Sequence, residues 1–224
     1  MDRLRLPKIL TLDEIKKLLS ELSNKTQVVF WGASDRVFCG GADLKFIIES
    51  SASEIESYFQ ELKNLILKIR SLDFSACFVD GFAAGGGLGI ISACDLVLGS
   101  QKSLFVLPEI KLGFGPFLVS VLLKRRMKLS FLKELAVSCE KKDAAWAKQA
   151  GLIDILVENE VEVASFLDNR SSNLVVFLKS LRCDYPELNE DFELRIKEVV
   201  AFLSLPETKD RLRKYLEEIS KTAS

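Results

Sequence analysis

Two features close together in the sequence could do chemistry: three consecutive glycines, Gly85 to Gly87, and a lone carboxylate, Glu109. The glycines follow a short apolar run, Ala76 to Val79, and open a second apolar segment that ends at Asp95. This order predicts a strand, a glycine loop and the start of a helix. Backbone at glycine approaches a ligand closely, and the first N–H groups of a helix are unpaired. Such a loop suits a phosphate, a carboxylate or a developing oxyanion.

The chain contains no histidine among its 224 residues. This excludes Ser-His-Asp and Cys-His catalysis, histidine general bases and histidine-ligated metals. Its five cysteines are widely spaced, odd in number and form no CxxC pair, so we interpret them as reduced core residues and expect no metal site. Acid or base chemistry must then come from carboxylates, lysine, tyrosine or cysteine.

Charge and hydropathy exclude other classes of partner. The formal net charge is −1, and the 31 lysines and arginines are spread along the chain, so we expect no nucleic-acid binding. No apolar run reaches the length of a membrane span, and the first ten residues lack the pattern of a signal peptide. We therefore predict a cytoplasmic protein that does not bind membranes.

The elements that must position the glycines and the acid alternate between helix and strand. Thr11 to Leu22 has helical apolar spacing, with Thr11 and Glu14 as a capping box, and Val28 to Trp31 is a buried strand. A second helix, which we expect Ser53 and Glu56 to cap, runs to Arg70. Strand, helix and strand at these spacings predict right-handed crossovers and a largely parallel sheet, so the fold class is α/β.

The remaining chain is mostly helical. We expect breaks at Asp184 to Pro186 and at Pro206. The predicted elements are helices over 117–123, 129–139 and 143–150, with Gly151 after the last, a short strand over 153–157, and helices from residue 160 to the end.

Several motifs in order resemble the crotonase family, that is, the enoyl-CoA hydratases and isomerases. The resemblance extends from about Thr11 to Ile155. The segments that carry it are Phe38 to Lys45 (FCGGADLK), Asp80 to Gly87 (DGFAAGGG), Ala93 to Asp95 (ACD), Leu107 to Gly113 (LPEIKLG) and Ala147 to Asp154 (AKQAGLID).

The resemblance implies a crotonase-like ββα spiral core over residues 1–157 and a helical C-terminal trimerisation region over 158–224. It also implies a homotrimer or a dimer of trimers. Family members open with a strand pair before the first helix, whereas at most Arg3 to Ile9 precedes it here, so the N-terminal strand pair looks truncated.

In this family two backbone amides bind the thioester oxygen of an acyl-CoA, and by motif they belong to Ala42 and Gly86. The substrate would be an acyl-CoA, with coenzyme A as part of the substrate and no tightly bound cofactor. The residues that the resemblance places near coenzyme A are Gly41, Ala42, Asp43, Leu44, Lys45 and Gly85.

The acids distinguish activities within the family. Hydratases use two glutamates; the first falls on Gly89 here and is absent, whereas the second falls on Glu109. A lone, desolvated glutamate can remove a proton from one carbon and return it to another. The resemblance therefore favours an enoyl-CoA isomerase, which shifts a double bond, over a hydratase.

Two alternatives remain open. The missing glutamate, the shortened N-terminus and Phe117, a bulky ring where the acyl pocket is expected, favour a catalytically degenerate binding or assembly subunit. A nucleotide-binding domain is also conceivable, because Gly87 to Ser92 partly matches GxGxxG, although the third glycine is absent.

Overall fold

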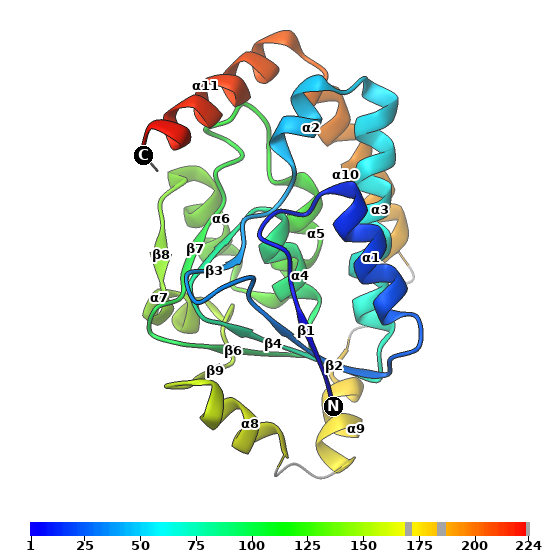
Figure 1. The fold of residues 1–224 in the computed structure, drawn as a ribbon, viewed down its shortest axis with the longest axis vertical. Coiled ribbons are helices and arrows are strands. Elements are labelled where there is room, and N and C mark those ends of the chain that lie inside the picture. Colours follow the sequence, from blue (N-terminus) through cyan, green and yellow to red (C-terminus); the bar gives the residue numbers. More distant parts are fainter. Residues whose placement is uncertain (169–171, 183–186, 223–224) are drawn as a thin grey trace.

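The computed structural model describes residues 1–168, 172–182 and 187–222. The predicted break at 184–186 lies outside these residues. Two sheets form the centre of the molecule, and helices cover them (Figure 1).

The larger sheet has five strands in the order β1, β2, β4, β6, β9, and all its pairs are parallel, as predicted. The smaller sheet has the order β3, β5, β7, β8, with only the β7–β8 pair antiparallel. The strands are β1 (Asp2–Arg5), β2 (Gln27–Trp31), β3 (Val37–Cys39), β4 (Phe74–Val79), β5 (Phe82–Ala84), β6 (Leu96–Gly99), β7 (Leu104–Val106), β8 (Lys142–Asp143) and β9 (Ile155–Leu156).

The chain repeats one unit, in which a strand of the larger sheet is followed by a strand of the smaller sheet and then by helix. The repeats are β2–β3 with α2 (Leu44–Glu49) and α3 (Ala52–Ser71), β4–β5 with α4 (Gly86–Ala93), and β6–β7 with α5 (Phe117–Arg126). This arrangement confirms the α/β class and the ββα spiral.

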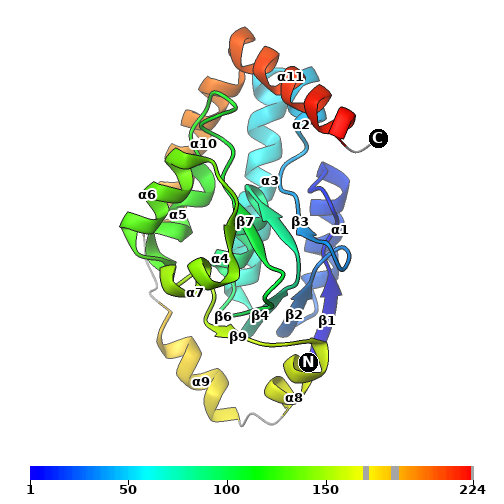
Figure 2. The same cartoon turned by 90° about the vertical axis from the view of Figure 1, so that its left-hand side faces the viewer.

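Both faces of the larger sheet are buried. Alternate side chains of β2 divide between two cores: Val28 and Phe30 face the main one, Val29 and Trp31 the smaller. Helix α1 (Leu12–Leu22) and α3 cover the main core, while α8 (Glu160–Asp168) and α9 (Ser172–Ser180) lie across the other face (Figures 1 and 2). Burial on both faces explains why β4 is apolar almost throughout.

Helix caps agree with the prediction in part. The Thr11 side chain accepts a hydrogen bond from the Glu14 N–H and so caps α1. The predicted Ser53–Glu56 cap of α3 is wrong, because α3 begins two residues earlier and its capping box is Ser51 with Glu54. The sequence contains two overlapping Ser-x-x-Glu patterns, and the first one satisfies the free N–H groups.

The C-terminal elements complete the molecule: α6 (Leu129–Ser138), α7 (Ala144–Ala150), α10 (Leu188–Leu203) and α11 (Pro206–Thr222). Asp143 caps α7, and Gly151 ends it in the left-handed region at φ 86°. The predicted strand over 153–157 is shorter and covers only Ile155–Leu156, and the Ile153 side chain before it packs against Gly99. Helix α11 lies beside α2 at one end of the molecule (Figures 1 and 2).

Three of the four cysteines within the described residues are buried, and all four are free thiols, consistent with reduced core residues. Nowhere in the described ranges is a helix both long and apolar enough to cross a bilayer. The boundary between a core over 1–157 and a helical region over 158–224 stays a prediction.

Candidate active site

A cavity of about 540 Å³ lies where the two glycine loops meet the segment after β7 and helix α11. Both predicted amide donors, Ala42 and Gly86, line it together with Glu109. The other predicted residues that line it are Asp43, Leu44, Lys45 and Gly85. Gly41 is buried behind this surface and brings the two loops together.

The two amides lie side by side because glycine permits it. A Cβ built on Gly41, whose φ is +88°, would stand 2.9 Å from Gly86 N and 2.7 Å from Ala84 O. A Cβ on Gly86 would stand 3.6 Å from Ala42 N. Within the described residues, neither the Ala42 N–H nor the Gly86 N–H donates a hydrogen bond. Two free donors at one point form a site for a carbonyl oxygen that gains negative charge.

Neighbouring polar groups fix the first loop. The buried Tyr58 hydroxyl donates to Leu10 O at 2.6 Å and accepts the Asp43 N–H at 3.2 Å. The Asp43 carboxylate accepts the N–H groups of Lys45 and Phe46 and so caps α2. Asp43 therefore fixes the loop, and its carboxylate is occupied by these two backbone hydrogen bonds.

Glu109 lies beside the amides and is almost completely buried, with 7% of its surface exposed. Its Oε1 would be 3.1 Å from a Cβ on Gly85, the residue before the Gly86 donor. Its main-chain oxygen accepts the N–H groups of Leu112 and Phe114, which fixes the turn that carries it. Its Oε2 has no hydrogen-bond partner in the part of the chain that the structure describes.

Burial raises the pKa of Glu109 from its ordinary value of 4.5 to about 7. A hydrogen bond from its own backbone N–H opposes this shift more weakly. Near neutral pH the carboxyl group can thus both accept and return a proton, which is what a proton shuttle requires.

Gly89, the position of the missing first glutamate, faces apolar side chains that a larger residue would have to displace. A Cβ there would meet Ile66 Cδ1 at 3.3 Å and Val119 Cγ1 at 3.4 Å. Gly89 is buried and does not line the cavity, so apolar packing fills the place of a second carboxylate.

One end of the cavity is apolar and buried. Phe117 lines it as predicted and stacks on Phe202, with ring centroids 5.5 Å apart and an angle of 23°. The buried side chains that line this end are Phe59, Leu62, Leu118, Val119 and Val199, from α3, α5 and α10. These apolar side chains suit an apolar group of a ligand.

Two exposed cations, Lys8 and Lys45, also line the cavity. Three residues of α11 that the sequence analysis did not predict also line the cavity: Tyr215, Leu216 and Ile219. Their spacing of one and four residues places them on one helix face, but no local pattern indicates that this face turns toward Glu109.

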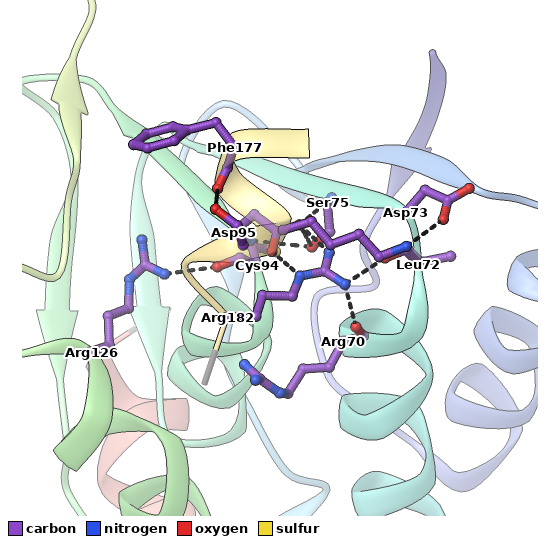
Figure 3. A network of polar contacts seen from close by, with 11 residues as sticks. Arg70, Leu72, Asp73, Ser75, Cys94, Asp95, Arg126, Phe177 and Arg182 are labelled. Atoms are coloured by element: carbon purple, nitrogen blue, oxygen red, sulfur yellow. Dashed lines mark hydrogen bonds and ion pairs between the residues drawn. The ribbon is translucent and has the colours of Figure 1, made fainter. Parts of the chain in front are cut away.

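Asp95 lies away from the cavity, at the other end of α4, in the network of Figure 3. Both of its carboxylate oxygens pair with the guanidinium of Arg182, and it also binds Ser75. Arg182 donates further to the carbonyl oxygens of Arg70 and Leu72 at 2.8 and 2.7 Å. These contacts use both carboxylate oxygens of Asp95 to join β4, the end of α4 and Arg182.

No three side chains among the described His, Cys, Asp and Glu residues converge as metal ligands.

Comparison with solved structures defines the class of protein as a crotonase fold. The crystal structure of an enoyl-CoA hydratase from Bacillus halodurans matches with a TM-score of 0.84, at 21% identity, over 95% of this chain and 96% of that one. The family model for enoyl-CoA hydratase/isomerase matches residues 9–220. The chain therefore belongs to the enoyl-CoA hydratase/isomerase family.

The relatives include proteins named as hydratases and one named as an isomerase/hydratase. "Probable enoyl-CoA hydratase 2, mitochondrial" of Arabidopsis thaliana is 30% identical over 88% of this chain and 71% of its own length. An enoyl-CoA isomerase/hydratase of Mycosarcoma maydis is 33% identical over 57% of this chain and 48% of its own length. The chain thus spans about half of the second relative.

Proposed function

We propose that this protein is an enoyl-CoA isomerase that moves a double bond from the 3,4 position of an acyl-CoA to the 2,3 position. The observation that carries the proposal is a single buried carboxylate, Glu109, beside two free amides, with apolar packing at Gly89 where a second acid would lie.

The proposed reaction needs no water and no second acid. The thioester oxygen accepts hydrogen bonds from the Ala42 and Gly86 N–H groups. Ionised Glu109 removes a proton from C2, and the electron pair of that C–H bond delocalises through C3–C4 and onto the thioester oxygen. The two amides stabilise this dienolate. Protonated Glu109 then returns the proton to C4, which leaves the double bond between C2 and C3.

The cavity supports an acyl-CoA substrate in this orientation. Its buried apolar side chains, which include Phe59 and Val199, suit an acyl tail, and the amides line the same cavity. The exposed ammonium groups of Lys8 and Lys45 suit the phosphates of coenzyme A.

The test compares wild type with Glu109→Gln on 3-hexenoyl-CoA, following the absorbance of the conjugated thioester and identifying products by mass spectrometry. We expect conjugation by wild type and a loss of at least 100-fold in the variant, on the order of general-base catalysis. Glu134→Gln, which removes an exposed carboxylate paired with Lys142, is the matched control and should keep full activity. Conjugation that persists in Glu109→Gln would refute the role of the base.

A second candidate is a non-catalytic subunit that binds acyl-CoA, favoured by the apolar packing at Gly89. Binding of hexanoyl-CoA in calorimetry without conjugation or hydration of any enoyl-CoA would select it. A homotrimer or a dimer of trimers stays a prediction, for which light scattering is the direct measurement.

A further inference from the structure

Helix α11 brings a phenol into the same cavity as Glu109. Tyr215 lines the cavity and is half-buried, with Leu216 and Ile219 beside it on the same helix. Within the described residues, neither the Tyr215 hydroxyl nor Glu109 Oε2 has a hydrogen-bond partner. The Tyr215 donor and a buried acceptor without a partner thus line one cavity, and a buried polar atom such as Glu109 Oε2 normally has a partner.

Contacts hold α11 against the segment that carries Glu109. The Lys209 ammonium donates to Ser50 O at 2.5 Å, at the end of α2. A Cβ on Gly113, four residues after Glu109, would meet Arg211 Cδ at 3.1 Å and Thr208 Oγ1 at 3.5 Å. The start of α11 therefore packs directly on the Glu109 turn, and Tyr215 lies about two helical turns further along.

The direction of the Tyr215 pKa shift is consistent with a position close to Glu109. Burial raises the pKa of Tyr215, and the negative charges of Glu109 and then of Glu218 raise it further. The phenol therefore keeps its proton at neutral pH and is a hydrogen-bond donor.

The other polar side chains around the cavity either cap helices or carry a charge, whereas the phenol of Tyr215 is neutral. The side-chain oxygens of Thr11 and Asp43 cap α1 and α2. The titratable or charged groups that line the cavity or act on Tyr215 are Lys8, Asp43, Lys45, Glu109, Tyr215 and Glu218. Among these, the phenol is the neutral donor.

We propose that Tyr215 is a positioning residue whose hydroxyl donates to the free carboxylate oxygen of Glu109 when an acyl-CoA occupies the cavity. This inference rests on the proposed isomerase function. The hydrogen bond would hold the carboxylate in one orientation while it carries the proton from C2 to C4. It would also stabilise the ionised form, since a donor to a carboxylate favours its charge.

The experiment removes only the hydroxyl. Tyr215→Phe keeps the ring that packs in α11, and Arg213→Gln, on the exposed side of the same helix, serves as the matched control. We expect Tyr215→Phe to lower kcat at pH 7 about tenfold with KM unchanged, and to move the acid limb of the kcat/KM profile upward by about one pH unit. Arg213→Gln should leave both unchanged.

A second readout does not need turnover. Glu109 is titrated by carbon-13 NMR of its labelled carboxyl group, assigned by its loss in Glu109→Gln, in the complex with saturated butyryl-CoA. We expect a higher Glu109 pKa in Tyr215→Phe than in wild type. An identical titration in the two complexes would overturn the proposal, even if isomerase activity is found. A shifted titration in a protein without isomerase activity would support the hydrogen bond and refute the proposed function.

Discussion

The carboxylate of Glu109 lies against Gly85: a Cβ on that glycine would stand 3.1 Å from Glu109 Oε1. Gly85 has φ +47°, where side chains are strained, so this position requires glycine both for its backbone and for its neighbour. The next residue provides the Gly86 amide. The contact of Glu109 with Gly85 therefore places this carboxylate next to the residue that offers the Gly86 amide.

The raised pKa of Glu109 makes activity and stability change with pH in opposite directions. Because the ionised form is the base, kcat/KM should rise as pH passes through about 7. In the folded state the pKa lies above its ordinary value of 4.5, so the folded protein holds this proton more tightly than the unfolded chain. The resulting stabilisation is complete below pH 4.5 and is lost as pH rises through about 7.

Glu109→Gln tests the stability half of this prediction. The amide cannot ionise, so the free energy of unfolding of the variant, relative to wild type, should increase by on the order of 3 kcal/mol between pH 4.5 and pH 8. Urea unfolding at several pH values measures the difference. A constant difference across this range would show that Glu109 titrates as a solvated carboxylate.

Gly41→Ala should separate the two amides. Its Cβ would come 2.7 Å from Ala84 O and 2.9 Å from Gly86 N, so the loops must move apart. Loss of a correctly placed donor costs about 10²- to 10³-fold in kcat. Turnover of 3-hexenoyl-CoA and the temperature of unfolding are the measurements.

The matched control is Gly151→Ala, at the C-terminal end of α7. This glycine has a similar φ of +86°, but its nearest neighbour, Arg126 O, is 3.4 Å from the new Cβ. The control carries the same backbone strain and should lose stability but little activity. Equal losses of activity in both variants would mean that strain, rather than displacement of the donors, is responsible.

Gly89→Glu should not create a hydratase. The new side chain would start between Ile66 Cδ1 and Val119 Cγ1, at 3.3 and 3.4 Å, and overpacking of this kind costs about 1–3 kcal/mol before the charge is considered. We expect a lower unfolding temperature and no hydration of crotonyl-CoA by mass spectrometry. Gly89→Ala, which adds only the Cβ, should be milder. Appearance of 3-hydroxybutyryl-CoA would contradict the packing described for this position.

Arg182→Met should be among the more destabilising substitutions of a polar residue. Arg182 and Asp95 are 10% and 5% exposed, and removing one partner of a buried pair costs about 3–5 kcal/mol. Lys179→Met, in helix α9 just before Arg182, breaks a pair with Asp73 in which both side chains are about half exposed, and should cost less than about 1 kcal/mol. Urea unfolding compares the two, and similar costs would argue against the importance of the buried pair.

The site could be foreseen where local chemistry dictates it. Glycines with positive φ and a cap such as Thr11 or Asp143 are local requirements, so the loops and several helix limits follow from the sequence. Competing local patterns defeat the same reasoning, as at Ser51 and Ser53, where both serines precede a glutamate by three residues.

Long-range contacts could not be foreseen. Tyr215 enters the cavity because α11 packs beside α2 and the Glu109 turn, more than 100 residues earlier. The Arg182–Asp95 pair joins residues 87 positions apart. Each depends on the tertiary arrangement of whole helices, and neither leaves a periodic signal in the sequence.

Helix α4 has eight residues and is therefore about 12 Å long. Its first residue offers the Gly86 amide, and at its far end Arg126 binds Cys94 O while Arg182 holds Asp95 (Figure 3). Because α4 is short and is held at this end, a tilt of the helix here would also move the Gly86 amide at its first residue. Arg182 follows α9 and lies away from the cavity, so a substitution there that loosens the far end of α4 would shift the Gly86 amide without altering any contact in the cavity.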